Sequence, residues 1–380
     1  MTTSRLLGEI IDNFDSLRVP ITSSKRTPGP YPYYGASGVV DHVESFIFDG
    51  PYLLIAEDGE NLRARSTPVA FMVDGQFWVN NHAHVVRGKT GICDTQFLSY
   101  YLSVTDISGY LSGSAQPKLS QASLNSIRIQ LPPLPEQQAI AEVLGALDDK
   151  IAANRKLVTT SLCLAQALHD QVVTAGDVTA ALYTDVAEVG GGATPKTRVP
   201  EYWDGDIHWA SPTDITALGA PYLHDTSRHI TQAGLDSCSS PLYPEGSILM
   251  TSRATIGAFA VAQEPTAVNQ GFIVLIPKRE ELRWWLLHDM MGRVKEFQNR
   301  ANGATFLELS KRTFKTMEFD LPSDTQLLRF DESARALHEH AIALGQESRT
   351  LAQLRDTLLP ALMDGTIRVK DAEKLTEEAV

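Results

Sequence analysis

The sequence predicts an α+β protein with a pseudo-twofold internal repeat, in which two similar globular domains are separated and followed by long helices. Segments 113–132 and 303–322 share residues at a constant spacing of 190 positions, which indicates an internal duplication. After each segment, apolar side chains change from a spacing of two to the spacing of a helix. The length of 380 residues also exceeds what one hydrophobic core usually supports, so two or more domains are expected.

Each duplicated segment ends in a predicted strand. Residues that recur between the two segments are Gly113, Leu119, Ser120, Leu131 and Pro132, which return as Gly303, Leu309, Ser310, Leu321 and Pro322. Just before each Leu-Pro pair, apolar residues alternate with polar ones, at Ile127 and Ile129 in the first copy and at Met317 and Phe319 in the second. A spacing of two is typical of a half-buried strand.

A long helix is predicted after each strand. Apolar or small residues recur in steps of three, four and seven over roughly five heptads, which resembles the seam of a coiled coil. The seams contain, in order along the chain, Leu147, Ile151, Asn154, Leu337, Leu344 and Leu351. Because a single polar residue on a seam fixes register at a cost in stability, Asn154 distinguishes the first helix from the second, where Leu344 is its counterpart. Two ordinary amphipathic helices that face a core are the alternative.

These patterns divide the chain into five segments. We expect a first globular domain at 1–134, a first helix at 135–180, a second domain at 181–323, a second helix at 324–366 and a C-terminal tail at 367–380. Two similar domains connected by helices could contact two separated targets with one molecule, and the helices would then set the distance between those targets.

Composition excludes some classes of protein, but it does not identify what this chain binds. The net charge is −13 and none of the segments has a positive net charge, although a DNA-binding protein usually carries basic stretches. No run of 18 apolar residues occurs, so no membrane helix is expected. The three cysteines are far apart in sequence, which favours a reducing cytoplasm over a disulfide or zinc framework.

Motifs in the second copy follow one another in a specific order. They are GGATPK at 191–196, PEYWDGDI at 200–207, GSILMTSRATIG at 246–257 and NQGF at 269–272. In this order they resemble the target-recognition domains of the specificity subunits of type I restriction-modification systems.

The first copy carries a divergent set of the same motifs. They are YYGASG at 33–38, LLIAEDG at 53–59 and FWVNNHAH at 77–84. The segment LPPLPEQQ at 131–138 resembles the junction into the first helical region of the same family, and the second copy lacks the fuller form of this junction.

The resemblance implies a fold and a mechanism. Each globular domain would be a mixed α/β unit that reads bases in the major groove of double-stranded DNA. The helices would form an antiparallel pair that binds two modification subunits. Those subunits would carry S-adenosylmethionine and methylate adenine, and restriction subunits would use ATP and Mg²⁺, while this chain binds no cofactor of its own. A stand-alone DNA-binding or scaffold protein of the same architecture is the alternative.

Catalytic motifs are not expected in this chain. The Pro132-Pro133 pair is flanked by leucines rather than by the Asp or Asn and the aromatic residue that an adenine methyltransferase needs. The acids at Asp148 and Asp149 precede Lys150 on a predicted helix rather than on a nuclease strand. Histidine pairs also occur, and we expect no metal site at His82 and His84, and solvated side chains at His338 and His340.

DNA contacts are expected from polar or basic residues in loops around the motifs. Arginine suits guanine through two parallel hydrogen bonds, and lysine suits phosphate. The tryptophans of the second copy are expected in its core rather than stacked on bases. The candidate DNA-binding residues are Lys25, Arg26, Ser37 and Lys118 in the first copy and Lys196, Arg198, Ser252, Arg253, Lys311 and Arg312 in the second.

Overall fold

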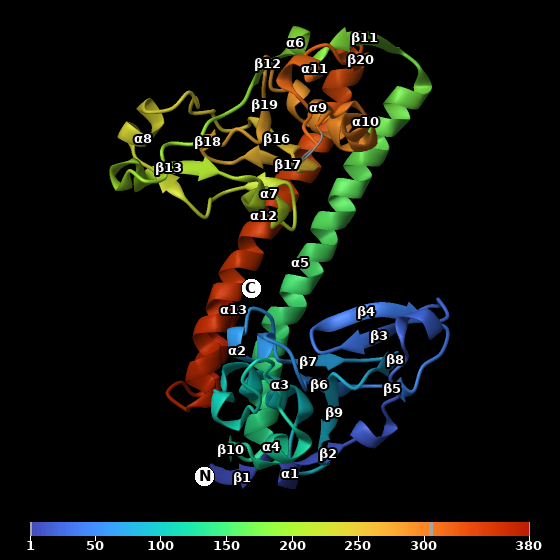
Figure 1. Cartoon of the computed structure of the whole chain (residues 1–380), viewed down its shortest axis with the longest axis vertical. Helices are drawn as coiled ribbons and strands as arrows, with labels where there is room; N and C mark the ends of the chain where they lie inside the picture. Colours follow the sequence, from blue (N-terminus) through green and yellow to red (C-terminus); the bar gives the residue numbers. More distant parts are fainter. Residues whose placement is uncertain (1, 304–306, 380) are drawn as a thin grey trace. The chain divides into compact units, whose positions relative to one another are not determined.

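The computed structural model describes residues 2–303 and 307–379, which form two compact units (Figure 1). The first unit contains Met1–Ala152 and Ser348–Val380, and the second contains Ala153–Glu347. Each unit combines one α/β domain with parts of two long helices, α5 (Leu134–Ala175) and α12 (Asp324–Met363). The mixed α/β domains and the long helices expected from the sequence are therefore confirmed.

The α/β domain of the first unit contains three small sheets. The two-stranded ladder pairs β1 (Thr3–Leu6) with β10 (Arg128–Leu131). The other two sheets have four strands each, in the orders β2 (Ile11–Asn13), β9 (Ala83–Gly88), β6 (Tyr52–Ala56), β7 (Ala70–Val73), and β4 (Gly38–Val43), β3 (Tyr31–Gly35), β8 (Gln76–Val79), β5 (Phe48–Asp49).

The α/β domain of the second unit repeats this arrangement. Its two-stranded ladder pairs β11 (Val178–Leu182) with β20 (Glu318–Pro322). The larger sheets have the orders β12 (Ala187–Gly190), β19 (Phe272–Pro277), β16 (Ile248–Arg253), β17 (Thr255–Ala262), β14 (Tyr222–Leu223), and β15 (His229–Ile230), β13 (Trp203–Ala210), β18 (Thr266–Val268). The parallel pair β13 and β18 matches the parallel pair β3 and β8, so the internal repeat extends to strand connectivity.

Short helices cover these sheets. In the first unit they are α1 (Leu7–Ile10), α2 (Asn61–Ala64), α3 (Thr95–Val104) and α4 (Gln121–Ser126), with single 3-10 turns at Asp15–Leu17, Ser23–Lys25 and Ser108–Tyr110. In the second unit they are α6 (Tyr183–Val186), α7 (Pro212–Thr216), α8 (Gln232–Asp236), α9 (Leu282–Gly292), α10 (Val294–Arg300) and α11 (Lys311–Phe314), with a 3-10 turn at Pro200–Tyr202.

The residues shared by the two copies have structural roles. Ser120 and Ser310 are the N-caps of α4 and α11, where each hydroxyl accepts a hydrogen bond from the amide three residues later. Leu119 and Leu309, one position earlier, are fully buried. Gly113 has φ +85°, a left-handed conformation that strongly favours glycine. The duplication recognised in sequence is therefore a repeated cap and a repeated core position.

The two long helices pack antiparallel within each unit. In the first unit, Leu147 and Ile151 of α5 share a core with Leu351 of α12. In the second unit, Leu168 and Val172 of α5 pack against the same core as Phe330 of α12. Early residues of one helix thus meet late residues of the other in both units, as the resemblance implied.

The helix ends differ from those expected. The first helix stops at Ala175 rather than 180, because Gly176 adopts φ +76° and the chain then forms β11, which pairs with β20. The second helix stops at Met363 rather than 366, before Gly365 with φ +77°. Pro360 lies inside its last turn.

The expected C-terminal tail contains a helix. Segment α13 (Val369–Ala379) is amphipathic, and its Ala372 is fully buried in the core of the first unit. Neither this helix nor any other in the described part of the chain is long and apolar enough to cross a lipid bilayer.

Candidate nucleic-acid interface and helix surfaces

Both α/β domains hold one position at the end of a central strand, β6 or β16, by the same pair of backbone hydrogen bonds. In the first domain the Glu57 amide donates to the carbonyl of His82 (2.9 Å) and its carbonyl accepts from Leu119 (2.8 Å). In the second domain Ser252 makes the same two bonds, with Gly271 (2.8 Å) and Leu309 (2.9 Å). Glu57 and Ser252 are therefore equivalent positions.

The next residue in each domain carries the opposite charge. Asp58 forms a β-bridge with Lys118, and its equivalent Arg253 forms a β-bridge with Glu308. Between the two domains, the acidic and the basic residue of this bridge are exchanged: the first domain has Asp58 where the second has Arg253, and Lys118 where the second has Glu308. In the second domain the two side chains form an ion pair of 2.8 Å, and both are about two-fifths exposed. The sequence signal was available for Glu308, since it lies 190 positions after Lys118.

The first domain fixes its version of this loop with a network of charged groups. The Arg18 guanidinium lies 2.8 Å from Glu57, and Lys118 lies 3.2 Å from the same carboxylate. Burial favours the protonated acid, but Arg18, His84 and Lys118 together outweigh it, so the pKa of Glu57 is lowered. His84 contacts Asp15 at 2.6 Å, and His82 contacts Asp58 at 2.8 Å. The carboxylates that contact these histidines come from distant segments, so the local sequence around His82 and His84 did not reveal them.

The remaining candidates of the first domain lie around the hairpin of β3 and β4. The Arg26 guanidinium pairs with Asp41 (3.1 Å) and lies 4.5 Å above the ring of Tyr33. Lys25 and Ser37 are exposed, and Ser37 lies in the tight turn of the hairpin.

The second domain exposes five of its six candidate residues, Arg253 among them, and buries the sixth. Lys196 and Arg198 are exposed in the loop after β12, and Lys311 and Arg312 are exposed at the start of α11. Lys311 lies beside the glycine motif, because a Cβ atom added to Gly191 would stand 3.0 Å from its Nζ atom. Ser252 is only 3% exposed, so we remove it from the candidate DNA contacts.

The seam residues of the helices do not form an outer surface. Leu147 and Leu351 are fully buried, Asn154 is 1% exposed, and Leu337 is half-buried. The Asn154 amide donates to Glu347 at 2.8 Å, so the polar seam residue joins the two helices within the second unit. We expected the helices that carry these residues to bind a partner, but the burial of the seam positions restricts them to packing the two helices. The large apolar side chains of α5 that face solvent are Leu157 and Leu164, seven positions apart.

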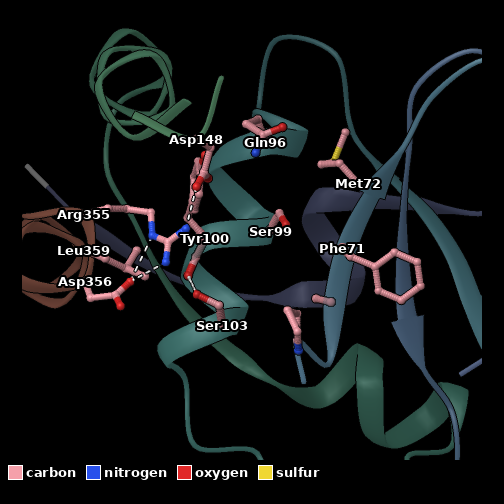
Figure 2. A pocket seen from close by; sticks show the side chains of 12 residues that line it. Phe71, Met72, Gln96, Ser99, Tyr100, Ser103, Asp148, Arg355, Asp356 and Leu359 are labelled. Carbon is pink, nitrogen blue, oxygen red and sulfur yellow. Dashed lines mark hydrogen bonds and ion pairs between the residues drawn. The ribbon is translucent and has the colours of Figure 1, made fainter. Parts of the chain in front are cut away.

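A polar link joins the α/β domain of the first unit to both helices (Figure 2). The Tyr100 hydroxyl of α3 donates to Asp148 of α5 (2.7 Å), and Arg355 of α12 pairs with the same carboxylate (2.6 Å). Burial and the Asp148 carboxylate raise the pKa of Tyr100. The link lines a pocket of about 370 Å³ with Phe71 and Met72 on its apolar side.

The second unit has a neutral link at the equivalent place. The Tyr222 hydroxyl donates to His338 Nδ1 of α12 (2.8 Å), and His338 Nε2 lies 3.0 Å from His288 Nε2 of α9. His288 Nδ1 lies 2.9 Å from the Gln166 carbonyl of α5, so His288 is the donor there. His288 then accepts from His338, and the four side chains form one directional chain.

This link corrects the expectation for His338. The side chain is 1% exposed and stacks on Trp284, with ring centroids 3.7 Å apart, whereas His340 is exposed as expected. Burial lowers the pKa of His288 to about 4 and that of His338 to about 2. The prediction that Trp203, Trp209, Trp284 and Trp285 lie in the core is confirmed.

Two equivalent α/β domains with differently charged loops, each linked to the same pair of helices, define a duplicated binding protein. The sequence model of the family described as "Type I restriction modification DNA specificity domain" matches residues 3–159 and 182–328. The chain belongs to this family.

Relatives and solved structures agree with this assignment. The HindI specificity subunit of Haemophilus influenzae is 21% identical, and the alignment covers 95% of this chain and 93% of that protein. The MjaIX specificity subunit of Methanocaldococcus jannaschii is 38% identical over 37% of this chain, and the match spans only 33% of its own length. The crystal structure of the S subunit from M. genitalium shares the fold, with a TM-score of 0.66, 15% identity and coverage of 95% and 96% of the two chains.

Proposed function

We propose that this chain is the DNA-specificity subunit of a type I restriction-modification complex and that its two domains read the two blocks of a bipartite DNA target. The observation that carries the proposal is the exchange of Asp58 and Lys118 for Arg253 and Glu308 at equivalent positions of one fold. An arginine suits guanine and an acid suits the amino group of cytosine. The same backbone would therefore present different chemistry to each block.

The chemistry of methylation and cleavage belongs to partners in this proposal. Two modification subunits would bind the helices, bring S-adenosylmethionine and methylate adenine, and restriction subunits would use ATP and Mg²⁺. The exposed pair Leu157 and Leu164 on α5 supports a docking surface on the helices. The net charge of −13 fits an arrangement in which the partners supply much of the positive surface around DNA.

Co-expression with a modification subunit tests this proposal. The complex should methylate adenine in cells, and methylome sequencing should return one motif with two specified blocks around unspecified bases. The purified chain alone should transfer no methyl group from labelled S-adenosylmethionine. Methyl transfer by the isolated chain, or sequence-specific DNA binding with no affinity for a modification subunit, would contradict the proposal and favour another class of protein.

A further inference from the structure

Two histidines face each other across paired strands of the second domain. His208 of β13 and His229 of β15 are direct neighbours in the register of this antiparallel pair. Asp225, in the loop that precedes β15, reaches the same point. In the sequence, Asp225 and His229 lie 17 and 21 positions after His208. None of the three residues is among the candidate DNA contacts.

The three side chains bring one ligand atom each to a common centre. His208 Nδ1 lies 3.2 Å from His229 Nε2, and Asp225 Oδ1 lies 3.4 Å and 3.2 Å from those two nitrogens. Three ligands of a tetrahedral zinc ion, each about 2.0–2.1 Å from the metal, stand about 3.3–3.4 Å from one another. An ion at that distance from all three atoms would lie only about 0.8 Å outside their plane, close to its place in a tetrahedron.

We propose that His208, Asp225 and His229 form a binding site for a divalent transition metal, with Zn²⁺ as the expected occupant. Imidazole nitrogen and carboxylate oxygen are common zinc ligands, and a three-ligand set leaves the fourth position to water. His208 binds through Nδ1 and keeps its proton on Nε2, and His229 binds through Nε2 and keeps its proton on Nδ1. Without an ion, a proton must lie between His208 Nδ1 and His229 Nε2, and the ion takes the place of that proton.

The carboxylate is held in place before any ion arrives. Asp225 Oδ1 accepts a hydrogen bond from the amide of Thr226 at 2.7 Å. The Thr226 hydroxyl accepts from the amide of Trp209 on β13 (3.1 Å) and donates to the carbonyl of Arg228 (2.7 Å). Thr226 is 6% exposed, so this anchor is part of the folded core. Such outer partners orient metal ligands and raise affinity.

A second cluster of potential metal ligands is already neutralised by basic side chains of the protein. Asp15, Glu57 and His84 also bring ligand atoms together, but Arg18 and Lys118 neutralise the two carboxylates there. At the proposed site the ion pairs of Asp225 are those with the two histidines themselves. The side chains of His208 and His229 are 22% and 30% exposed, which gives an ion a path from solvent.

The bound ion would join three segments of one sheet. It would connect β13, β15 and the loop between β14 and β15, and so stiffen the three-stranded sheet of the second domain. Because the ligand nitrogens must be unprotonated, binding should weaken as the pH falls.

Metal titration of the full chain tests the proposal. Protein stripped with a chelator and returned to chelator-free buffer is titrated with Zn²⁺ against a chromogenic zinc indicator, and separately with Co²⁺, whose visible absorption distinguishes tetrahedral from octahedral sites. We expect one equivalent of Zn²⁺ per chain and a tetrahedral Co²⁺ spectrum. His208→Ala and His229→Ala should abolish both signals, and Asp225→Asn should weaken binding by at least the roughly tenfold loss seen when outer-shell partners are removed.

Matched controls separate this site from others. His340→Ala removes an exposed histidine of α12, and Glu57→Gln alters the neutralised cluster; both variants should bind Zn²⁺ as the parent does. Circular dichroism checks that each variant is folded. A parent chain that binds no Zn²⁺ would overturn the proposal, and so would a parent whose single equivalent survives in all three ligand variants.

Discussion

Arg253 is the single residue whose substitution best tests the proposed DNA recognition. It follows the backbone position that both domains hold identically, and its side chain is 43% exposed. Its partner Glu308 orients the guanidinium without burying it. The guanidinium can therefore leave this carboxylate and bind a base edge or a phosphate while the chain stays folded. An exposed ion pair of this kind contributes little stability, of the order of 0–1 kcal/mol.

We therefore predict that Arg253→Ala impairs DNA binding without unfolding the chain. If the guanidinium reads a guanine, discrimination at one base pair should fall by about 1–3 kcal/mol, and if it holds a phosphate all sequences should weaken evenly. Binding of target variants by the assembled complex distinguishes these results. The control is Arg300→Ala, which removes another exposed arginine paired with a glutamate. Unchanged affinity for every target in Arg253→Ala would exclude this loop from the interface.

Single residues were the least predictable level of the structure. Ser252 and Arg253 are adjacent in sequence, yet one is buried and the other exposed, because successive side chains of a strand point to opposite faces and β16 ends at Arg253. The burial of His338 depends on Trp284 and Tyr222, which approach it from other elements. No local pattern contains such partners, so residue type alone suggested a solvated histidine.

At the scale of elements, the two units attach their domains to the helices with different chemistry. The first unit uses the charged link of Tyr100, Asp148 and Arg355, and the second uses the neutral link through His288 and His338. Asp148 and His338 are 190 positions apart, so the repeat preserved the place of the link and changed its charge.

The histidine link predicts acid sensitivity of the second unit. The pKa values of His288 and His338 are lowered from 6.5 to about 4 and about 2, chiefly by burial. As the pH falls below 6.5, the unfolded chain takes up protons that the folded chain cannot accept until about pH 4. The free energy of unfolding should therefore fall in this window by about 1.4 kcal/mol per pH unit for each imidazole.

Denaturant unfolding of the whole chain between pH 7 and pH 4.5 measures this slope, and hydrogen exchange assigns it to α9 and α12. His338→Phe should reduce the slope, because it removes one of the two groups and keeps a ring on Trp284. His340→Ala should not change it. Equal slopes in the parent and in His338→Phe would show that the link does not titrate as described.

The long helices were predictable in type and direction, because a steady spacing of apolar residues needs no distant partner. Their ends were less so. The first helix was expected to reach 180, but Gly176 stops it and residues 178–182 are needed by β20 as a strand partner. The paired residues are more than 130 positions apart in sequence, and the local spacing of apolar residues does not indicate such a pairing.

The helices also predict where a partner would bind. Leu157→Asp together with Leu164→Asp changes exposed side chains, so the chain should remain folded and lose a modification subunit. Leu351→Ala is the contrasting control, because a fully buried leucine should cost about 2–5 kcal/mol of stability. Size-exclusion chromatography and thermal unfolding separate the two effects. Normal assembly of the doubly substituted chain would place the docking surface elsewhere.

At the scale of the whole molecule, the duplication was the most informative feature of the sequence. The spacing of 190 residues indicated two copies, and the order β2-β9-β6-β7 of the first copy returns in the second as β12-β19-β16-β17. The target itself could not be derived, because the loops that differ between the copies are the ones that would contact bases. Because the framework is duplicated and the loops differ, we propose that each domain reads its own block of DNA.

Exchange of one domain tests that claim most directly. The segment to exchange is 178–322, because β11 and β20 pair with each other and must move together. Residues 178–322 are replaced with the corresponding domain of a relative, and the chimera is expressed with the modification subunit for methylome sequencing. We expect a motif in which one block changes while the other block and adenine methylation are retained. A motif altered in both blocks, or a single undivided motif for the parent, would contradict it.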